Sequence, residues 1–89
     1  MSKIEEIEFP NEINIDIAKE IVGRLRDIDV LVLKGDFKRI KIVKFVSPVE
    51  LFLVFGEKYI CDSDDDCGWV DILKIFDNLE ELAWFINSL

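Results

Sequence analysis

The sequence predicts an α+β fold: a four- to five-stranded, mostly antiparallel sheet with two helices packed on one face, in the order β-α-β-β-β-β-β-α. Two segments carry apolar residues at helical spacing, and several short apolar runs rich in β-branched residues lie between them. The turns that separate these runs are too short to hold a crossover helix, so neighbouring strands should pair antiparallel. At 89 residues, the chain should form one compact domain over residues 1–89.

The first third of the chain predicts an edge strand followed by a helix. Residues 3–9 place Ile7 and Phe9 on the same face of a short strand. The helix should begin near Asp16, because aspartate favours the N-cap position, and it should end near Ile28. The apolar residues of this helix fall within one arc: Ile17, Ala18, Ile21, Val22, Leu25 and Ile28.

Four strand-like runs follow, and turn-forming residues separate them. The turns are expected at Gly35-Asp36, Ser47-Pro48 and Gly56-Glu57. The runs themselves cover residues 30–33, 39–46, 51–55 and 58–61.

Residues 69–76 fit either a helical stripe or a strand. Asp77 with Glu80 three residues later forms a variant of the capping box, which favours a strand before this point and a helix over residues 78–88. Trp84 lies about 160° from the centre of the apolar face of that helix, so we expect its side chain to be exposed.

Charge is unevenly distributed along this chain of net charge −8. Residues 45–89 carry ten acidic and two basic side chains, whereas residues 21–44 carry seven basic and three acidic ones. No apolar run is long enough for a membrane span, and the first residues lack a secretory pattern, so we expect a cytoplasmic protein with no membrane partner. The chain lacks His, Gln and Thr, and its enrichment in Lys and Glu is a thermophile-like composition that an AT-rich genome would also produce.

An acidic cluster of Asp62, Asp64, Asp65 and Asp66 is the densest concentration of charge. Its one-three-five spacing is that of a calcium loop, but Cys67 occupies the position that requires glycine, so no standard metal site is predicted. A solvated loop explains the cluster most simply. The functional interpretation is an acidic contact surface for a basic partner.

Cys61 and Cys67 flank this cluster. If residues 58–61 and 69–75 form a hairpin, the two cysteines lie opposite each other at a Cα separation of about 4.5–5.5 Å, which a disulfide tolerates. The alternative is a pair of small buried hydrophobic side chains. Cytosolic disulfides are unusual except in hyperthermophiles. A zinc site is disfavoured, because two cysteines and no histidine leave only carboxylates to complete the four ligands.

The basic strand at residues 38–44 is a candidate nucleic-acid surface, with Lys38, Arg39, Lys41 and Lys44 along it. The net charge of −8 opposes this interpretation, since it repels phosphates at long range. There is no histidine for general base catalysis and no glycine-rich phosphate loop. We therefore expect no enzymatic activity and no cofactor.

These observations favour a small acidic protein-binding module, an inhibitor or immunity-type factor that occupies a basic surface on a protein partner. The alternatives are a homodimeric structural or accessory protein without its own chemistry and, second, a nucleic-acid binder that uses the basic strand. The residues expected to contact the partner are Asp62, Asp64, Asp65, Asp66, Glu80, Glu81 and Trp84.

Overall fold

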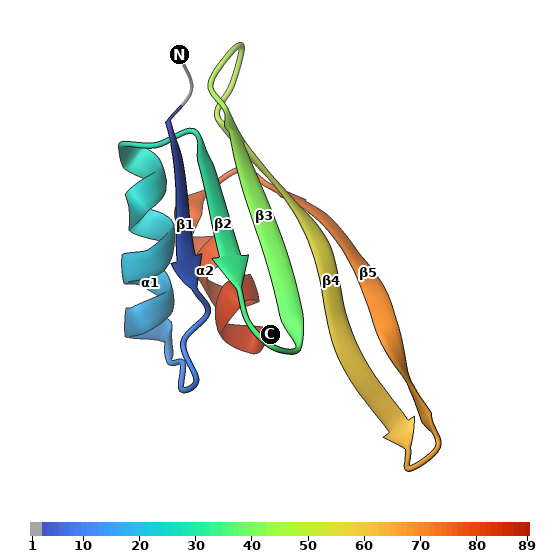
Figure 1. Cartoon of the computed structure of the whole chain (residues 1–89). Coiled ribbons are helices and arrows are strands. Elements are labelled where there is room, and N and C mark those ends of the chain that lie inside the picture. The colour runs from blue at the N-terminus through green and yellow to red at the C-terminus, as the bar shows by residue number, and fades with distance from the viewer. Residues whose placement is uncertain (1–2) are drawn as a thin grey trace.

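The computed structural model describes residues 3–89 and shows one sheet with two helices against one of its faces (Figure 1). The five strands lie in the order in which they occur along the chain; the first two are parallel and the other neighbours antiparallel. The predicted α+β class, the mostly antiparallel sheet and the edge position of the first strand are therefore confirmed. The elements are β1 (Ile4–Glu8), α1 (Ile15–Gly23), a 3-10 turn (Arg24–Arg26), β2 (Val30–Lys34), β3 (Lys38–Phe45), β4 (Leu51–Ser63), β5 (Asp66–Phe76) and α2 (Leu79–Ser88).

The core lies between the sheet and the two helices. Alternate residues of the central strands point toward the helices, as the two-residue period of a strand requires. Phe9, after β1, is buried against the same layer, as its predicted face implies. The least exposed side chains of the core include Leu31, Leu33, Ile40, Ile42, Phe52 and Val54 from the sheet, and Ala18, Val22, Leu82, Ala83 and Ile86 from the helices.

Both helices begin with an asparagine N-cap rather than the predicted aspartate. The side-chain oxygens of Asn14 and Asn78 accept hydrogen bonds, at 2.9 and 2.8 Å, from the backbone N–H groups three residues later. These bonds satisfy N–H groups that have no partner within the helix. Asp16 instead lies in the first turn of α1, and Asp77 accepts a hydrogen bond from the Asn78 side chain at 3.0 Å. The predicted caps were thus wrong by one or two residues.

The first helix is also shorter than expected, because α1 ends at Gly23 and the chain continues as a 3-10 turn. Leu25 in that turn and Ile28 after it remain buried. The apolar positions identified in the sequence therefore do pack into the core, although the last of them are not α-helical.

Residues 51–63 form one continuous strand, so the turn expected at Gly56-Glu57 is not present. Gly56 has a φ of +156°, and a Cβ atom at this position would lie 1.9 Å from the carbonyl oxygen of Arg39 on β3. Glycine inside a strand often marks such a close approach of two backbones. Residues 69–76 belong to β5, which confirms the strand that the capping-box variant at Asp77 favoured.

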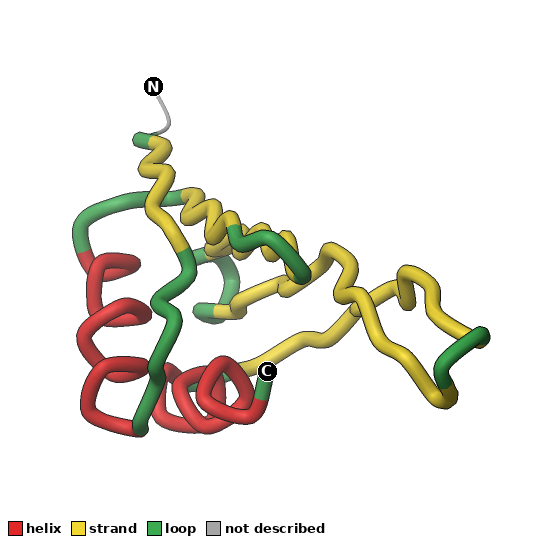
Figure 2. The backbone as a smooth tube through the Cα atoms, turned by 60° about the horizontal axis from the view of Figure 1, so that its bottom comes forward, coloured by secondary structure: helices red, strands yellow, loops and turns green. Residues whose placement is uncertain are grey.

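The β4–β5 hairpin extends beyond the rest of the sheet. The pairing of β3 with β4 ends at Lys38 and Lys58, and Lys58 in turn pairs with Val70. Residues 59–69 therefore form a two-stranded hairpin arm, which projects away from the helices and the other strands (Figure 2). The radius of gyration of 13.5 Å exceeds the roughly 12 Å of a globular chain of this length.

We predict that Gly56→Ala lowers the free energy of unfolding by at least about 2 kcal/mol, because β3 must move away and the backbone angle becomes strained. Gly68→Ala in the same hairpin is the matched control, because a Cβ there meets no atom within 4 Å. It should change stability by less than about 0.5 kcal/mol. Urea unfolding of the two variants and the wild type measures both values. Equal effects of the two substitutions would contradict the close approach at Gly56.

Candidate functional site

The four clustered aspartates lie at the tip of the hairpin arm. The β4–β5 pairing ends with Ser63 opposite Asp66, and the two residues between them form the turn. All four carboxylates are exposed, and none belongs to an ion pair among residues 3–89. Within the same residues, no group of three or more His, Cys, Asp or Glu side chains is arranged to hold a metal ion. The tip is thus a concentrated negative charge that faces water.

A disulfide joins the two strands directly below this tip. Cys61 and Cys67 are opposed in the β4–β5 register, with an Sγ–Sγ distance of 2.08 Å and a Cα–Cα distance of 4.0 Å. The predicted hairpin and the bridge across it are confirmed, and the alternative of two buried free thiols is excluded. The bridge restricts how far the acidic turn can open.

Aromatic side chains connect the base of the arm to the rest of the sheet. Tyr59 and Trp69 are opposed on β4 and β5, with ring centroids 5.5 Å apart. Phe37, just before β3, lies 6.0 Å from the Tyr59 ring and accepts a hydrogen bond from the Tyr59 backbone N–H at 2.7 Å. The Arg39 guanidinium lies 5.0 Å from the Trp69 ring centroid, a cation–π distance. These contacts fix the direction in which the arm leaves the sheet.

The other expected contact residues lie on α2, far from the tip. Trp84 is 53% exposed, which confirms the prediction from the helical period, and Glu80 and Glu81 are exposed one turn earlier. The eleven residues of β5 span roughly 33 Å between the tip and the turn that precedes α2. The structure therefore holds two separate acidic surfaces and does not bring their residues together.

The basic residues on the helix-free face of the sheet are largely neutralised. Lys34 pairs with Glu6 at 2.7 Å, and Arg39 pairs with Glu57 at 3.6 Å. Lys41 extends over the ring of Phe55, at 5.7 Å from its centroid. Exposed pairs of this kind add little to stability, but they cancel the positive potential that a phosphate backbone would need.

The other two lysines of β3 point to the opposite, helix-covered side. The Lys38 ammonium donates to the carbonyl oxygen of Leu89 at 2.7 Å, and the Lys44 ammonium donates to that of Leu25 at 2.5 Å. Burial, together with the neighbouring Lys58 ammonium, lowers the pKa of the Lys38 ammonium. The basic residues at 38–44 are thus divided between two faces and do not form one positive surface.

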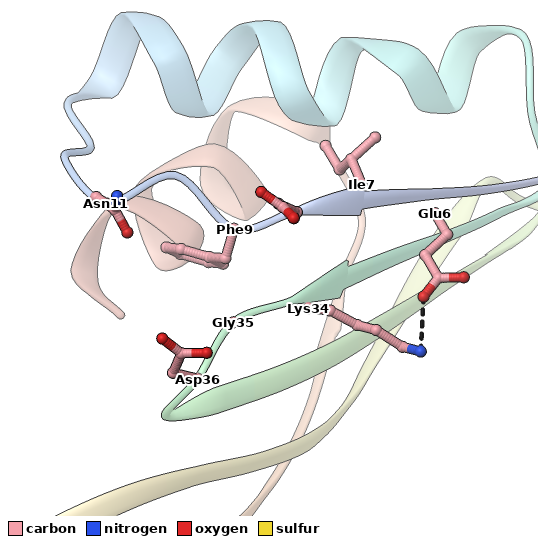
Figure 3. Close-up of a pocket in the computed structure, with 8 residues that line it drawn as sticks. Glu6, Ile7, Phe9, Asn11, Lys34, Gly35 and Asp36 are labelled. Atoms are coloured by element: carbon pink, nitrogen blue, oxygen red, sulfur yellow. Dashed lines mark ion pairs between the residues drawn. The ribbon is translucent and has the colours of Figure 1, made fainter.

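A groove of about 580 Å³ runs along β1 and the turn between β2 and β3. Carboxylates of Glu6, Glu8 and Asp36 line it, and Figure 3 shows Lys34 directed toward Glu6, away from Gly35 and Asp36. Because the lysine is engaged by its own ion pair, the groove presents mainly carboxylates and offers no nucleophile–base pair. We assign no chemistry to it.

The helix-free face of the sheet carries an apolar surface that was not predicted from the sequence. Residues 51–55 are apolar at every position, and such a run indicates a strand that is covered on both sides. The helices cover one side only. Leu53 and Phe55 on β4 are partly exposed on the other, and Leu73 and Ile75 beside them on β5 are 70% and 66% exposed. This uninterrupted apolar pattern was the signal that could have revealed the surface.

Comparison of this chain with known proteins finds no matching family model, no matching curated sequence and no matching solved structure. Among residues 3–89, neither helix has the length and apolar character needed to cross a bilayer. Any statement about function therefore depends on the surfaces described above.

We predict that replacing Cys61 and Cys67 with serine lowers the free energy of unfolding by roughly 2 kcal/mol, the loop-entropy value for a six-residue separation. The core should stay intact, because the bridge lies in the arm. Urea unfolding with and without a reductant measures the effect: the reductant should weaken the wild type and leave the double variant unchanged. A wild type insensitive to reductant would mean that the bridge does not form in solution.

We predict that Trp84→Ala changes the free energy of unfolding by less than about 1 kcal/mol, because the side chain is exposed and alanine is the better helix former. Phe52→Ala is the comparison variant, since Phe52 is 1% exposed, and it should cost about 3–5 kcal/mol. Thermal and urea unfolding of both variants make the test. A loss at Trp84 as large as that at Phe52 would show that Trp84 is packed in solution.

Proposed function

We propose that this protein is a small acidic protein-binding module, an inhibitor or immunity-type factor whose hairpin tip occupies a basic surface on a protein partner. One observation carries the proposal: four exposed aspartates sit at the end of an arm that projects beyond the fold, and a disulfide closes the arm beneath them. A projecting tip can enter a concave basic site that the flat sides of a sheet cannot reach.

Electrostatics supports this use of the tip. Uncompensated carboxylates attract a basic surface over distances of about 8–10 Å at ordinary salt, and this attraction accelerates association. The disulfide restricts the loop before binding, so less conformational entropy is lost when the complex forms. Trp84 with Glu80 and Glu81 would form a second, independent contact surface on α2.

The structure supports the two alternative functions, nucleic-acid binding and homodimer formation, to different extents. The neutralised and divided basic residues of β3 give little support to nucleic-acid binding. The apolar helix-free face favours the homodimeric alternative, which is developed below. A cytoplasmic location stays part of the proposal; it is compatible with the disulfide if the source is a hyperthermophile, and the Lys- and Glu-rich composition is compatible with such a source.

The test compares two variants with the same net charge. In the tip variant, Asp62, Asp64, Asp65 and Asp66 become asparagine. In the control variant, four exposed acidic residues elsewhere become the corresponding amides: Glu12, Glu20, Asp27 and Glu50.

We predict that a partner recovered from native lysate and then purified binds the tip variant at least about tenfold more weakly than the control variant. Raising the salt concentration should weaken wild-type binding, mainly through a slower association rate. Surface plasmon resonance at two salt concentrations measures both quantities. If the two variants bind equally, net charge alone would explain the interaction and the tip would have no specific role.

A further inference from the structure

The helix-free face of β3, β4 and β5 contains an uncovered apolar strip. An antiparallel sheet with one solvated face ordinarily places polar side chains on that face. Here the register aligns apolar side chains across the strands, and a charged row follows them. Large exposed apolar patches mark interaction surfaces. Read from β3 through β4 to β5, the rows are Val43–Leu53–Ile75, Lys41–Phe55–Leu73 and Arg39–Glu57–Asp71.

We propose that a second copy of this chain covers the strip, about a two-fold axis that runs parallel to β4. This rotation exchanges the β3 and β5 ends of every row. Ile75 then faces Val43 of the second copy, which joins apolar to apolar. Asp71 faces Arg39 of the second copy, which joins opposite charges. In the middle row Phe55 faces Phe55 of the second copy, and Leu73 faces Lys41, whose alkyl chain can cover it while the ammonium lies over the Phe55 ring. The first and third rows are thus complementary to themselves in both chemistry and position.

The two-fold rotation also brings complementary side chains together at the base of the arm. Trp69 on the β5 side is 42% exposed, and Phe37 at the end of β3 is 62% exposed. The same rotation places Trp69 of one copy against Phe37 of the other, which adds an aromatic contact on each side of the axis at the arm end of the interface. Glu57 lies near the axis and faces Glu57 of the second copy; the ion pair of each with Arg39 of its own chain limits the repulsion between them.

Other arrangements of two copies would place charged side chains against apolar ones or bring acidic side chains together. A two-fold axis across the strands, through the middle row, would set the first row of one copy against the third row of the other, and so bury charges against apolar side chains. Antiparallel pairing of the two β5 edges would bring the acidic tip of one copy beside Asp77 and Glu80 of the other. The axis parallel to β4 keeps the first row against the first and the third against the third, so its one contact between a charged and an apolar side chain is that of Lys41 with Leu73.

The test is sedimentation velocity over a range of protein concentrations, with one variant inside the strip and one outside it. Ile75→Glu lies inside the strip, where it faces Val43 of the second copy, and Ile75 is 66% exposed, so the single copy should fold normally. Ile4→Glu is the matched control: Ile4 is 67% exposed on the same face, but it lies on β1, beyond the reach of the second copy's three strands.

We predict a wild-type dimer with a micromolar dissociation constant and a rise of roughly a hundredfold for Ile75→Glu, because two isoleucines lose their burial and two carboxylates are set against Val43. Ile4→Glu should behave as the wild type. Raising salt should leave the dimer intact or strengthen it, since each copy carries a net charge of −8. A wild type that stays monomeric at about 1 mM would overturn the proposal, and so would a dimer that is unchanged by Ile75→Glu or that dissociates with Ile4→Glu.

A charge exchange tests the position of the axis. Asp71→Arg alone should weaken the dimer, because it brings two cations together across the interface. Adding Arg39→Glu should restore the dimer, since each copy then carries the reversed pair and Glu57 can pair with the new arginine beside it. If the double variant dissociates as readily as Asp71→Arg while its melting temperature stays at the wild-type value, the proposed axis is wrong.

Discussion

The hairpin tip and the helix-free face both depend on the register in which β4 pairs with β3 and β5. Alternate residues of β4 face opposite sides of the sheet, so a slip by one residue would turn Phe52 and Val54 out of the core. It would also misalign the cross-strand rows of side chains on the helix-free face. Gly56 opposes such a slip, because a residue with a Cβ atom does not fit against the Arg39 carbonyl. The register of β4 with β5 sets Cys61 opposite Cys67, so formation of the disulfide requires the same strand pairing that the core requires.

The local features of this fold could be predicted from the sequence, whereas contacts between distant segments could not. The hairpin around the aspartates was predictable, since its turn residues and the cysteine spacing lie within a few positions. The helix caps were harder, because Asn14 and Asp16 are both good cap residues and the incoming loop decides between them. Gly56 is typical of a turn, and only its approach to β3, far away in sequence, shows why the strand continues there.

The same distinction between local features and distant contacts applies to the candidate surfaces. Exposure of the Asp cluster and of Trp84 followed from loop chemistry and helical period, but the long path of β5 between them is a property of the assembled sheet. The charges of β3 could be counted in the sequence, yet their partners could not. The two-residue period of a strand places Lys38 and Lys44 on the opposite face from Arg39 and Lys41. The sequence could not show that their ammonium groups donate to carbonyl oxygens 51 and 19 residues away.

The hairpin arm adds length to the fold without adding to its core. A two-stranded ribbon is marginally stable in water, and four clustered aspartates weaken it further through mutual repulsion. The disulfide and the Tyr59–Trp69 contact offset this loss, whereas a hairpin that turned near Lys58 would not need them. An extension that lowers the stability of the fold is explained if its tip contacts a partner protein. Salt weakens contacts between opposite charges and spares apolar ones, so the tip and the helix-free face can act independently within one hairpin.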